Sequence, residues 1–416
     1  MADPIVVTGL GAVSALGLNA AENFAAASAG QGGIAPVEFD TGELEPLVRG
    51  PRGPAPFMAS VALVKGDAHA ALEAALERRV GASFDVFSVY ALKAAHEALA
   101  EAGLITGERM GGRTAVIMGN GVGGLHTQEK AYEKFYGLRG GKVHPMTVPR
   151  AMMSAPASAI AMEWGITGAV FATSSACASS GHAIAQGAGL IALGMADVAI
   201  VGGSEAMATP GGMKSWEGLQ ATSDTMCRPF SIDRDGMTIG EGGAALVIER
   251  LSHAQARGAR VIATLAGYGQ SSDAFHWTQP SLEGPVASMR QACEAAGFLD
   301  GRQVLISAHG TGTPLNDKNE SAAIHEIFGA NAKKHPVIAT KSGHGHVIGA
   351  SAALQAVIAL KALEAGIAPP ILNYLGPDPE CDVDLVLGQA RPIDAKSLLV
   401  NAFAFGGLNV SLAFTV

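Results

Sequence analysis

Short apolar runs alternate along this chain with longer stretches in which apolar residues recur at helical spacing. The runs at 114–119, 197–203 and 304–308 predict buried strands. The stretch from Phe84 to Ala102 has apolar residues three and four positions apart, which predicts a helix packed on the core. Strands that alternate with helices in this way favour an α/β fold.

The first apolar run, residues 5–11, predicts a strand that ends in a tight glycine turn. Its Gly9-x-Gly11 pair is similar to a dinucleotide-binding loop, but the third glycine of that loop is missing and Ser14 stands in its place. We therefore exclude a dinucleotide site here. A helix is predicted from about Asn19 to Gly30.

Two stretches, 182–193 and 349–365, are apolar or small nearly all round. Helices of this composition are enclosed by protein on every side. Each follows a strand and a turn, so the chain is predicted to contain a duplicated unit with helices between sheets. We place the two halves at residues 1–255 and 256–416.

Cys177 lies at the centre of the first half. The apolar strand at 168–172 leads into a turn of small residues, which puts Cys177 at or next to the start of the following helix. Free backbone N–H groups and the helix dipole favour negative charge there, so we expect a lowered pKa and a nucleophilic thiolate. The alternative is a buried structural cysteine.

Two histidines of the second half, His309 and His346, each follow an apolar strand and lie beside glycine. A thiolate can accept an acyl group from a thioester, and two imidazoles can donate to a developing enolate. The alternative is that both histidines are satisfied within the core. Lys341 follows a strand that should be buried and needs a partner, for which Asp317 and Glu320 are the candidates.

The totals limit what the protein does. A chain of 416 residues is too long for one small core, and its net charge of −9 argues against general nucleic-acid binding. The beginning of the sequence lacks the features of a signal peptide, and no apolar run is expected to be long enough to span a membrane. The cysteines are sparse and share no metal-ligand spacing, which predicts a reduced cytoplasmic protein without a disulfide framework and without a metal centre. They are Cys177, Cys227, Cys293 and Cys381.

With these residues identified, the chain resembles the elongating class of β-ketoacyl-acyl-carrier-protein synthases over almost its whole length. The most specific segments are 175–179, 309–313 and 341–346. The resemblance implies the thiolase-like fold, an αβαβα arrangement of five layers made by two duplicated halves, in a homodimer. It also implies an acyltransferase that joins malonyl-carrier protein to a cysteine-bound acyl chain in a decarboxylating Claisen condensation. No cofactor is implied beyond the phosphopantetheine of acyl carrier protein.

The resemblance assigns a catalytic role to several residues. Cys177 corresponds to the nucleophile, and His309 and His346 correspond to the pair that holds the malonyl thioester carbonyl. Lys341 corresponds to the lysine that organises the site, with Glu320 as its ion-pair partner.

Other positions correspond to the surroundings of the reaction. The backbone N–H groups of Cys177 and Phe405 match the oxyanion hole, and Phe405 also matches a gating phenylalanine. The remaining matches are the hinge glycines Gly406 and Gly407, the phosphopantetheine-binding Thr311 and Thr313, Val122 near the acyl tunnel, and the carrier-protein surface residues Arg78, Arg79, Arg139, Lys142 and Lys214.

The sequence departs from the family pattern at four positions. Gln355 stands where the family usually has Glu, which puts a nearby structural cation site in doubt. Ala404 replaces a glycine before the gate, and Leu408 and His344 each replace a threonine. These changes favour a specialised relative. The alternative function is a non-catalytic subunit that sets chain length in a heterodimer with a related ketosynthase, although such subunits typically lack the cysteine.

Overall fold

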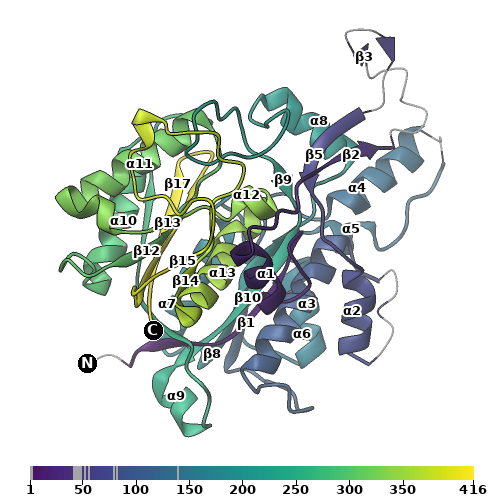
Figure 1. Cartoon of the computed structure of the whole chain (residues 1–416). Coiled ribbons are helices and arrows are strands. Elements are labelled where there is room, and N and C mark those ends of the chain that lie inside the picture. The colour runs from purple at the N-terminus through teal and green to yellow at the C-terminus, as the bar shows by residue number, and fades with distance from the viewer. Residues whose placement is uncertain are drawn as a thin grey trace.

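A computed structural model describes residues 3–40, 49–50, 53–54, 57–77, 80, 83–137 and 140–416 (Figure 1). Its main feature is one ten-stranded sheet in the order β13-β12-β16-β17-β11-β1-β10-β8-β6-β7. The strands of the first half are β1 (Ile5–Val13), β6 (Thr114–Gly119), β7 (Val170–Thr173), β8 (Val198–Glu205) and β10 (Gly242–Arg250). Those of the second half are β11 (Ala263–Ser272), β12 (Val304–Ser307), β13 (Val337–Ile338), β16 (Ser397–Ala404) and β17 (Leu408–Thr415).

The two halves have the same strand order. From the middle of the sheet outward, each half presents its first, fifth, fourth, second and third strand. The halves meet where β1 pairs antiparallel with β11, at Val6↔Thr264 and Val7↔Ala263. The predicted duplication is therefore confirmed, while the residue at which one half ends stays a prediction.

The helices form three of the five layers. The long ones are α3 (Val86–Glu101), α6 (Ala155–Trp164), α7 (Ser179–Ala192), α10 (Glu283–Ala296), α11 (Pro314–Phe328) and α13 (Ser351–Ala365). Figure 1 shows α7 and α13 in the middle, and both contact strands of both halves. Helices α3 and α6 cover the outer face of the first half, and α10, backed by α11, covers that of the second. The predicted five-layer α/β fold is confirmed.

Shorter elements complete the described chain. The other helices are α1 (Ala20–Ser28), α2 (Ala68–Ala75), α4 (Leu125–Tyr132), α5 (Thr147–Ala151), α8 (Pro210–Leu219), α9 (Leu251–Ala256) and α12 (Lys341–His344). A π-helix covers Glu133–Gly137, and 3-10 helices cover Gly329–Lys334, Ile348–Ala350 and Pro379–Cys381. Small sheets join β2 (Ala35–Phe39), β5 (Phe57–Ala62) and β9 (Ile239–Gly240), then β3 (Arg49–Gly50) with β4 (Gly53–Pro54), and β14 (Ile367–Ala368) with β15 (Arg391–Pro392).

The glycine turn predicted within residues 5–11 is wrong, because β1 continues through both glycines. A Cβ atom on Gly9 would lie 1.9 Å from the carbonyl oxygen of Ala98, and one on Gly11 would lie 1.9 Å from that of Ala94. Both carbonyls belong to α3. The glycines therefore let a helix lie directly on the strand, and they do not reverse the chain.

The expectation that no apolar run could span a membrane is also wrong by length and composition. The helical segment Ile348–Ala365 is long and apolar enough, but 83% of it is buried inside the fold. Its composition follows from its place between the two halves of the sheet, where every face of α13 meets protein.

Candidate active site

Cys177 lies in the turn between β7 and α7, next to the helix start as predicted. Its neighbour Ala176 has a φ of +49°, a left-handed conformation that costs free energy for a residue with a side chain. Ser179 secures the turn, because its hydroxyl oxygen accepts from the N–H of Ser175 at 2.9 Å and its O–H donates to the carbonyl of Ala176 at 2.7 Å. The sulfur is thus held on a tight, strained turn.

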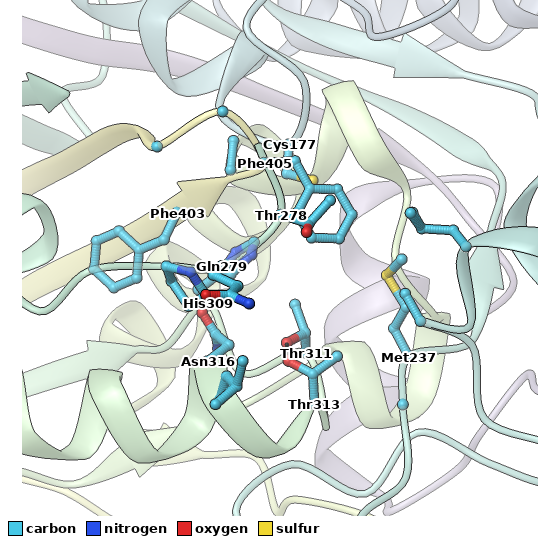
Figure 2. A pocket seen from close by; sticks show the side chains of 18 of the residues that line it. Cys177, Met237, Thr278, Gln279, His309, Thr311, Thr313, Asn316, Phe403 and Phe405 are labelled. Carbon is cyan, nitrogen blue, oxygen red and sulfur yellow. Dashed lines mark hydrogen bonds between the residues drawn. The ribbon is translucent and has the colours of Figure 1, made fainter. Parts of the chain in front are cut away.

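The fold brings the three predicted reactive residues into one cavity of about 370 Å³ (Figure 2). The sulfur of Cys177 and one ring nitrogen each of His309 and His346 all lie within 4.8 Å of one another. The two imidazole rings stand almost perpendicular, with centroids 5.5 Å apart. Since the cysteine comes from the first half of the chain and both histidines from the second, the duplication itself assembles this site.

The hydrogen bonds of His346 fix its tautomer. Its Nδ1 accepts from the backbone N–H of Ile348 at 3.1 Å and lies 2.8 Å from the hydroxyl of Ser351. An accepting Nδ1 carries no proton, so the proton is on Nε2. This Nε2 is buried, has no hydrogen-bond partner among the described residues, and belongs to a residue that lines the cavity.

Lys341 fixes the tautomer of His309 in the same way. Its Nζ donates to the carbonyl oxygen of His309 at 2.5 Å and to Oε1 of Gln355 at 2.6 Å, and it lies 3.3 Å from Nδ1 of His309. An ammonium has no lone pair, so this Nδ1 is the acceptor and the ring proton is on Nε2. Both imidazoles therefore offer N–H donors at Nε2, and not lone pairs for a metal.

Both histidines are neutral at pH 7. Burial lowers the pKa of His309 and of His346 well below the usual value, and the positive charge of Lys341 lowers both further. Burial also lowers the pKa of Lys341, while the carboxylate of Glu320 raises it. The cavity thus holds two neutral hydrogen-bond donors backed by one cation.

The lowered pKa expected for Cys177 is wrong. Burial raises the pKa of its thiol to about 11, although the charge of Lys341 and the backbone N–H of Phe405 act in the opposite direction. The cost of a bare thiolate on a side chain as buried as Cys177 exceeds the benefit of the helix start. The sulfur of the substrate-free protein is therefore a thiol.

The predicted ion pair between Lys341 and Glu320 is also wrong, because the ammonium of Lys341 and the carboxylate of Glu320 are not in direct contact. The carboxylate of Glu320 accepts from the backbone N–H groups of His309 at 2.8 Å and Gly310 at 2.9 Å, and from Asn401 at 3.1 Å. Glu320 therefore holds the segment that carries His309 and acts on the lysine only through space.

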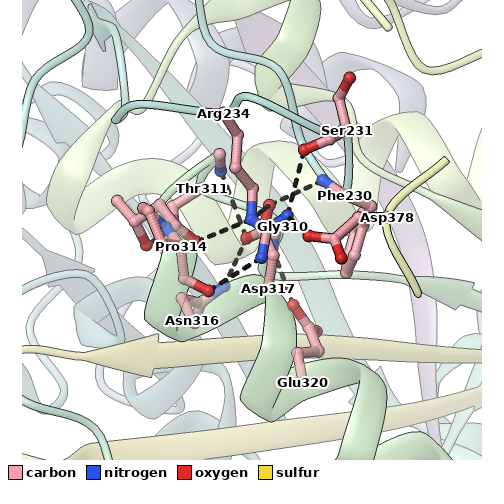
Figure 3. Close-up of polar contacts among 12 residues, drawn as sticks. Phe230, Ser231, Arg234, Gly310, Thr311, Pro314, Asn316, Asp317, Glu320 and Asp378 are labelled. Atoms are coloured by element: carbon pink, nitrogen blue, oxygen red, sulfur yellow. Dashed lines mark hydrogen bonds and ion pairs between the residues drawn. The ribbon is translucent and has the colours of Figure 1, made fainter. Parts of the chain in front are cut away.

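Asp317, the other candidate partner of Lys341, belongs to a separate network (Figure 3). Its carboxylate accepts from the N–H of Phe230 at 2.7 Å and faces Nε of Arg234 at 3.8 Å. Arg234 donates to the carbonyls of Pro314 at 3.0 Å and Thr313 at 3.4 Å and pairs with Asp378. Arg234 could not be predicted from the sequence, because its polar, glycine-containing surroundings have no periodicity that marks a buried residue.

This network secures the wall of the cavity that contains the two predicted pantetheine-binding threonines. Thr311 and Thr313 both line the cavity, and their hydroxyl oxygens lie 2.8 Å apart. The lining continues to Leu219 and Leu315, which are 41% and 53% exposed. The cavity therefore extends from Cys177 to the surface.

Phe405 lines the same cavity beside Cys177 (Figure 2). Its backbone N–H interacts with the sulfur and lowers the pKa of the thiol. The next two residues, Gly406 and Gly407, have φ angles of +80° and +70°. Glycine adopts this conformation without steric cost, which suits a hinge. Val122 does not line the cavity; it packs with Phe405 in an apolar cluster.

The residues predicted to meet a carrier protein are only partly placed. Arg78, Arg79 and Arg139 lie outside the described residues. Lys142 and Lys214 are exposed, and Lys214 forms an ion pair with Glu217 at 2.5 Å.

Gln355 tests whether the cation implied by the resemblance fits this chain. The amide nitrogen of this fully buried side chain faces three backbone carbonyl oxygens, those of Ala308 at 2.7 Å, Asn401 at 3.3 Å and Ser307 at 3.4 Å. These oxygens would be cation ligands, and the amide N–H groups already point at them. The residues present therefore do not fit a cation at this point.

Comparison with known proteins gives a consistent result along the whole chain. Residues 2–254 match the description "Beta-ketoacyl synthase, N-terminal domain", and residues 262–375 match "Beta-ketoacyl synthase, C-terminal domain". The chain is 38% identical over 411 residues to Nodulation protein E of Rhizobium meliloti, covering 99% of this chain and 98% of that protein. It is 34% identical over 420 residues to 3-oxoacyl-[acyl-carrier-protein] synthase 2 of Coxiella burnetii, with 99% and 98% covered.

Solved structures agree with these sequence matches. The ishigamide ketosynthase/chain length factor superimposes with a TM-score of 0.89 at 30% identity and full coverage of both chains. A type II polyketide acyl-carrier protein in complex with its ketosynthase matches with a TM-score of 0.87 at 27% identity, again with full coverage of both chains.

Proposed function

The chain belongs to the β-ketoacyl synthase family, and from this premise we propose that it catalyses a decarboxylating Claisen condensation. The acyl chain would be bound to Cys177, and the extender would be malonyl-acyl carrier protein. The observation that carries the proposal is the convergence of the Cys177 sulfur and the ring nitrogens of His309 and His346 within 4.8 Å.

Acyl transfer to Cys177 is the first step. The sulfur attacks the thioester carbonyl of acyl-carrier protein, the old carbon–sulfur bond breaks, and the carrier leaves as a thiol with the proton of Cys177. Charge develops on the carbonyl oxygen during the attack, and the backbone N–H groups of Cys177 and Phe405 are the donors assigned to it. Burial raises the pKa of the Cys177 thiol to about 11, so the sulfur carries its proton before the exchange begins.

Decarboxylation and condensation follow in the same cavity. The carbon–carbon bond to the malonyl carboxylate breaks and carbon dioxide leaves. The electron pair of that bond forms an enolate, whose oxygen accepts hydrogen bonds from the Nε2–H groups of His309 and His346. The enolate carbon then attacks the acyl group on Cys177 and the carbon–sulfur bond breaks. The released sulfur takes a proton from solvent, which restores the thiol. Neutral imidazoles suit this role because they donate hydrogen bonds without transferring a full proton.

Acyl carrier protein is the proposed partner at the cavity mouth. Thr311 and Thr313 lie between the surface and Cys177, where a phosphopantetheine arm would pass. The solved complex of a relative with its acyl-carrier protein supports this assignment. Both substrates then arrive on the carrier's own phosphopantetheine, and no further cofactor is needed.

A homodimer is proposed through the free edge of β7. This strand ends the ten-stranded sheet and is paired there on one side with β6. Phe171 on β7 is 36% exposed and nearby Met162 on α6 is 71% exposed. An exposed apolar sheet edge favours pairing with another chain. A related ketosynthase is the alternative partner, since solved relatives include ketosynthase/chain length factor pairs.

The substrate proposed is that of a specialised elongating synthase in fatty-acid or polyketide-like biosynthesis. Identity to Nodulation protein E, 38%, exceeds the 34% identity to 3-oxoacyl-[acyl-carrier-protein] synthase 2, and four positions depart from the family pattern. An enzyme close in specificity to synthase 2 remains the broader proposal, and a cytoplasmic location stays a prediction.

Incubation with acyl-carrier proteins of graded chain length, followed by mass spectrometry of the intact protein, tests the proposal. The wild type should gain one acyl group on Cys177, and Cys177→Ala should gain none while still releasing carbon dioxide from malonyl-carrier protein. A wild-type protein that gains no acyl mass would support the non-catalytic chain-length subunit instead. A Cys177→Ala variant that still elongates acyl chains would refute the role of the cysteine.

A further inference from the structure

The ring of Phe405 has a second neighbour that the reaction does not use. Trp216, on α8, stacks on Phe405 with ring centroids 6.3 Å apart and planes 27° apart. Trp216 is half-buried and belongs to the apolar cluster that also contains Val122, Met213 and Ile348. The stack therefore joins the predicted gate to a packed apolar cluster.

Phe405 lies where this apolar cluster meets the open cavity. Cys177 and Phe405 line the cavity, whereas Val122 and Ile348 do not. These two residues pack in the cluster with Phe405 and Trp216. Phe405 belongs to both the cavity lining and the cluster, as Met237 does. An acyl chain that extends from the sulfur into the cluster on the side of Phe405 must displace the ring from its position against Trp216.

Trp216 and Phe405 are carried by backbone segments that differ in how firmly they are held. Helix α8 is fixed at its start, where the hydroxyl of Thr209 accepts from the N–H of Gly212 at 3.1 Å and Glu129 binds both residues, at 2.5 and 2.9 Å. Phe405, by contrast, precedes Gly406 and Gly407, whose positive φ angles suit a hinge. A movable ring thus rests against a fixed one.

We propose that Trp216 is a positioning residue that holds the Phe405 gate closed until an acyl chain displaces it. The inference rests on the proposed function, because it assumes that an acyl chain becomes attached to Cys177. Aromatic stacking of this kind changes an equilibrium roughly twofold to tenfold. The indole should therefore slow the entry of long acyl chains and keep the Phe405 ring in place while no acyl chain is bound.

The test compares Trp216→Ala with Trp216→Phe, which keeps an aromatic ring at the gate. The rate of acylation of Cys177 by long-chain acyl-carrier protein is measured by mass spectrometry. Trp216→Ala should be acylated roughly threefold to tenfold faster, and Trp216→Phe should stay near the wild-type rate. The control is Trp164→Ala, which removes a ring contact of the same 6.3 Å length, with His96, far along the chain from the gate.

A double-mutant cycle separates this role from a general loosening of the fold. If Trp216 acts through the gate, Trp216→Ala should change the rate little in a Phe405→Ala background. Acylation should also shift tryptophan emission in the wild type, and the part due to Trp216 should disappear in Trp216→Phe. An equal effect of Trp216→Ala with and without Phe405 would overturn the proposal, as would failure of Trp216→Phe to restore the rate. A wild type that takes up no acyl group would refute the proposed function, not the gate.

Discussion

The ammonium of Lys341 lies 3.3 Å from Nδ1 of His309 while it donates to the carbonyl oxygen of the same residue. One buried cation thereby sets both the position and the tautomer of an imidazole. His346 reaches the same tautomer without a charge, through Ser351 and the N–H of Ile348. His309 is thus held by a charged group and His346 by neutral groups, so the two donors should respond differently to mutation and to pH.

Lys341→Met should reduce malonyl decarboxylation by about 10²-fold or more, because His309 would no longer be held with its donor toward the substrate. Carbon dioxide release from malonyl-carrier protein measures this step alone. Lys361→Met is the matched control. Lys361 is a partly buried lysine that pairs with Glu101 at 3.0 Å and does not line the cavity. Decarboxylation at the wild-type rate in Lys341→Met would contradict the assignment.

The same lysine predicts the alkaline limit of the reaction. Burial lowers the pKa of Lys341 from its usual value, so the ammonium loses its proton at a lower pH than an exposed lysine would. Decarboxylation by the wild type should therefore fall at a pH below the usual lysine pKa of about 10.4.

Alkylation of Cys177 should be slow at neutral pH and should rise steadily with pH. The thiolate reacts, and a thiol with a pKa of about 11 is ionised to roughly one part in a thousand at pH 8. The rate with iodoacetamide should thus increase about tenfold per pH unit between pH 7 and 9. Peptide mass spectrometry identifies the modified residue, and Cys177→Ala gives the background from the three other cysteines. A rate that levels off below pH 8 would restore the low pKa expected from the helix start.

Much of this site could be predicted from the sequence, because local patterns place it. The apolar strands and small-residue turns that precede Cys177, His309 and His346 are continuous in sequence, and the structure brings all three to one cavity. The failures concern contacts that depend on how the elements pack and not on local sequence pattern. Lys341 donates to Gln355 and not to Glu320, and the glycines of β1 face helix residues 83 or more positions away.

The raised pKa of Cys177 has the same origin as those failures. A helix start is visible in the sequence, whereas the degree of enclosure depends on how both halves close around the sulfur. Trp216 was missed for this reason as well, since α8 meets Phe405 only after the chain has folded.

Gln355→Glu should create a need for a monovalent cation. The carboxylate cannot donate to the three carbonyl oxygens that the amide now faces, and an unsatisfied buried group of this kind costs about 1–3 kcal/mol. The urea midpoint of the variant should fall, and potassium or sodium should restore it relative to choline at equal ionic strength. Wild-type stability should not distinguish these salts. A specific potassium or sodium effect on the wild type would show that a cation still binds near the amide.

Phe171→Asp should separate the proposed dimer. Phe171 lies on β7, the outermost strand of the sheet, where a second copy of the chain would cover it in the proposed dimer. An aspartate there would be buried without a partner charge, which is strongly unfavourable. Sedimentation velocity should give a dimer for the wild type and a monomer for Phe171→Asp. Ile105→Asp, at a residue 41% exposed elsewhere, serves as the control. A wild-type monomer would favour a separate partner subunit.

Glu205 predicts how stability depends on pH close to the active site. Its buried carboxylate accepts from the N–H groups of Gly121 at 2.5 Å, Gly349 at 3.1 Å and Val122 at 3.3 Å, and so ties the glycine-rich turn to the start of α13. Burial nevertheless raises its pKa from 4.5 to about 7, although these N–H groups lower it. Between those two pH values the folded protein therefore binds more protons at Glu205 than the unfolded chain does.

The sign follows from that difference. The contribution of Glu205 to stability is full below about pH 4.5 and is lost as the pH rises to about 7, a change of roughly 3 kcal/mol. Glu205→Gln removes this titration, so the unfolding free energy of the variant should depend less on pH across the same window. Urea unfolding at pH 5 and pH 7.5 measures the difference, with exposed Glu108→Gln as the control. If the wild type and Glu205→Gln have parallel pH profiles, Glu205 is ionised throughout, and its N–H partners outweigh its burial.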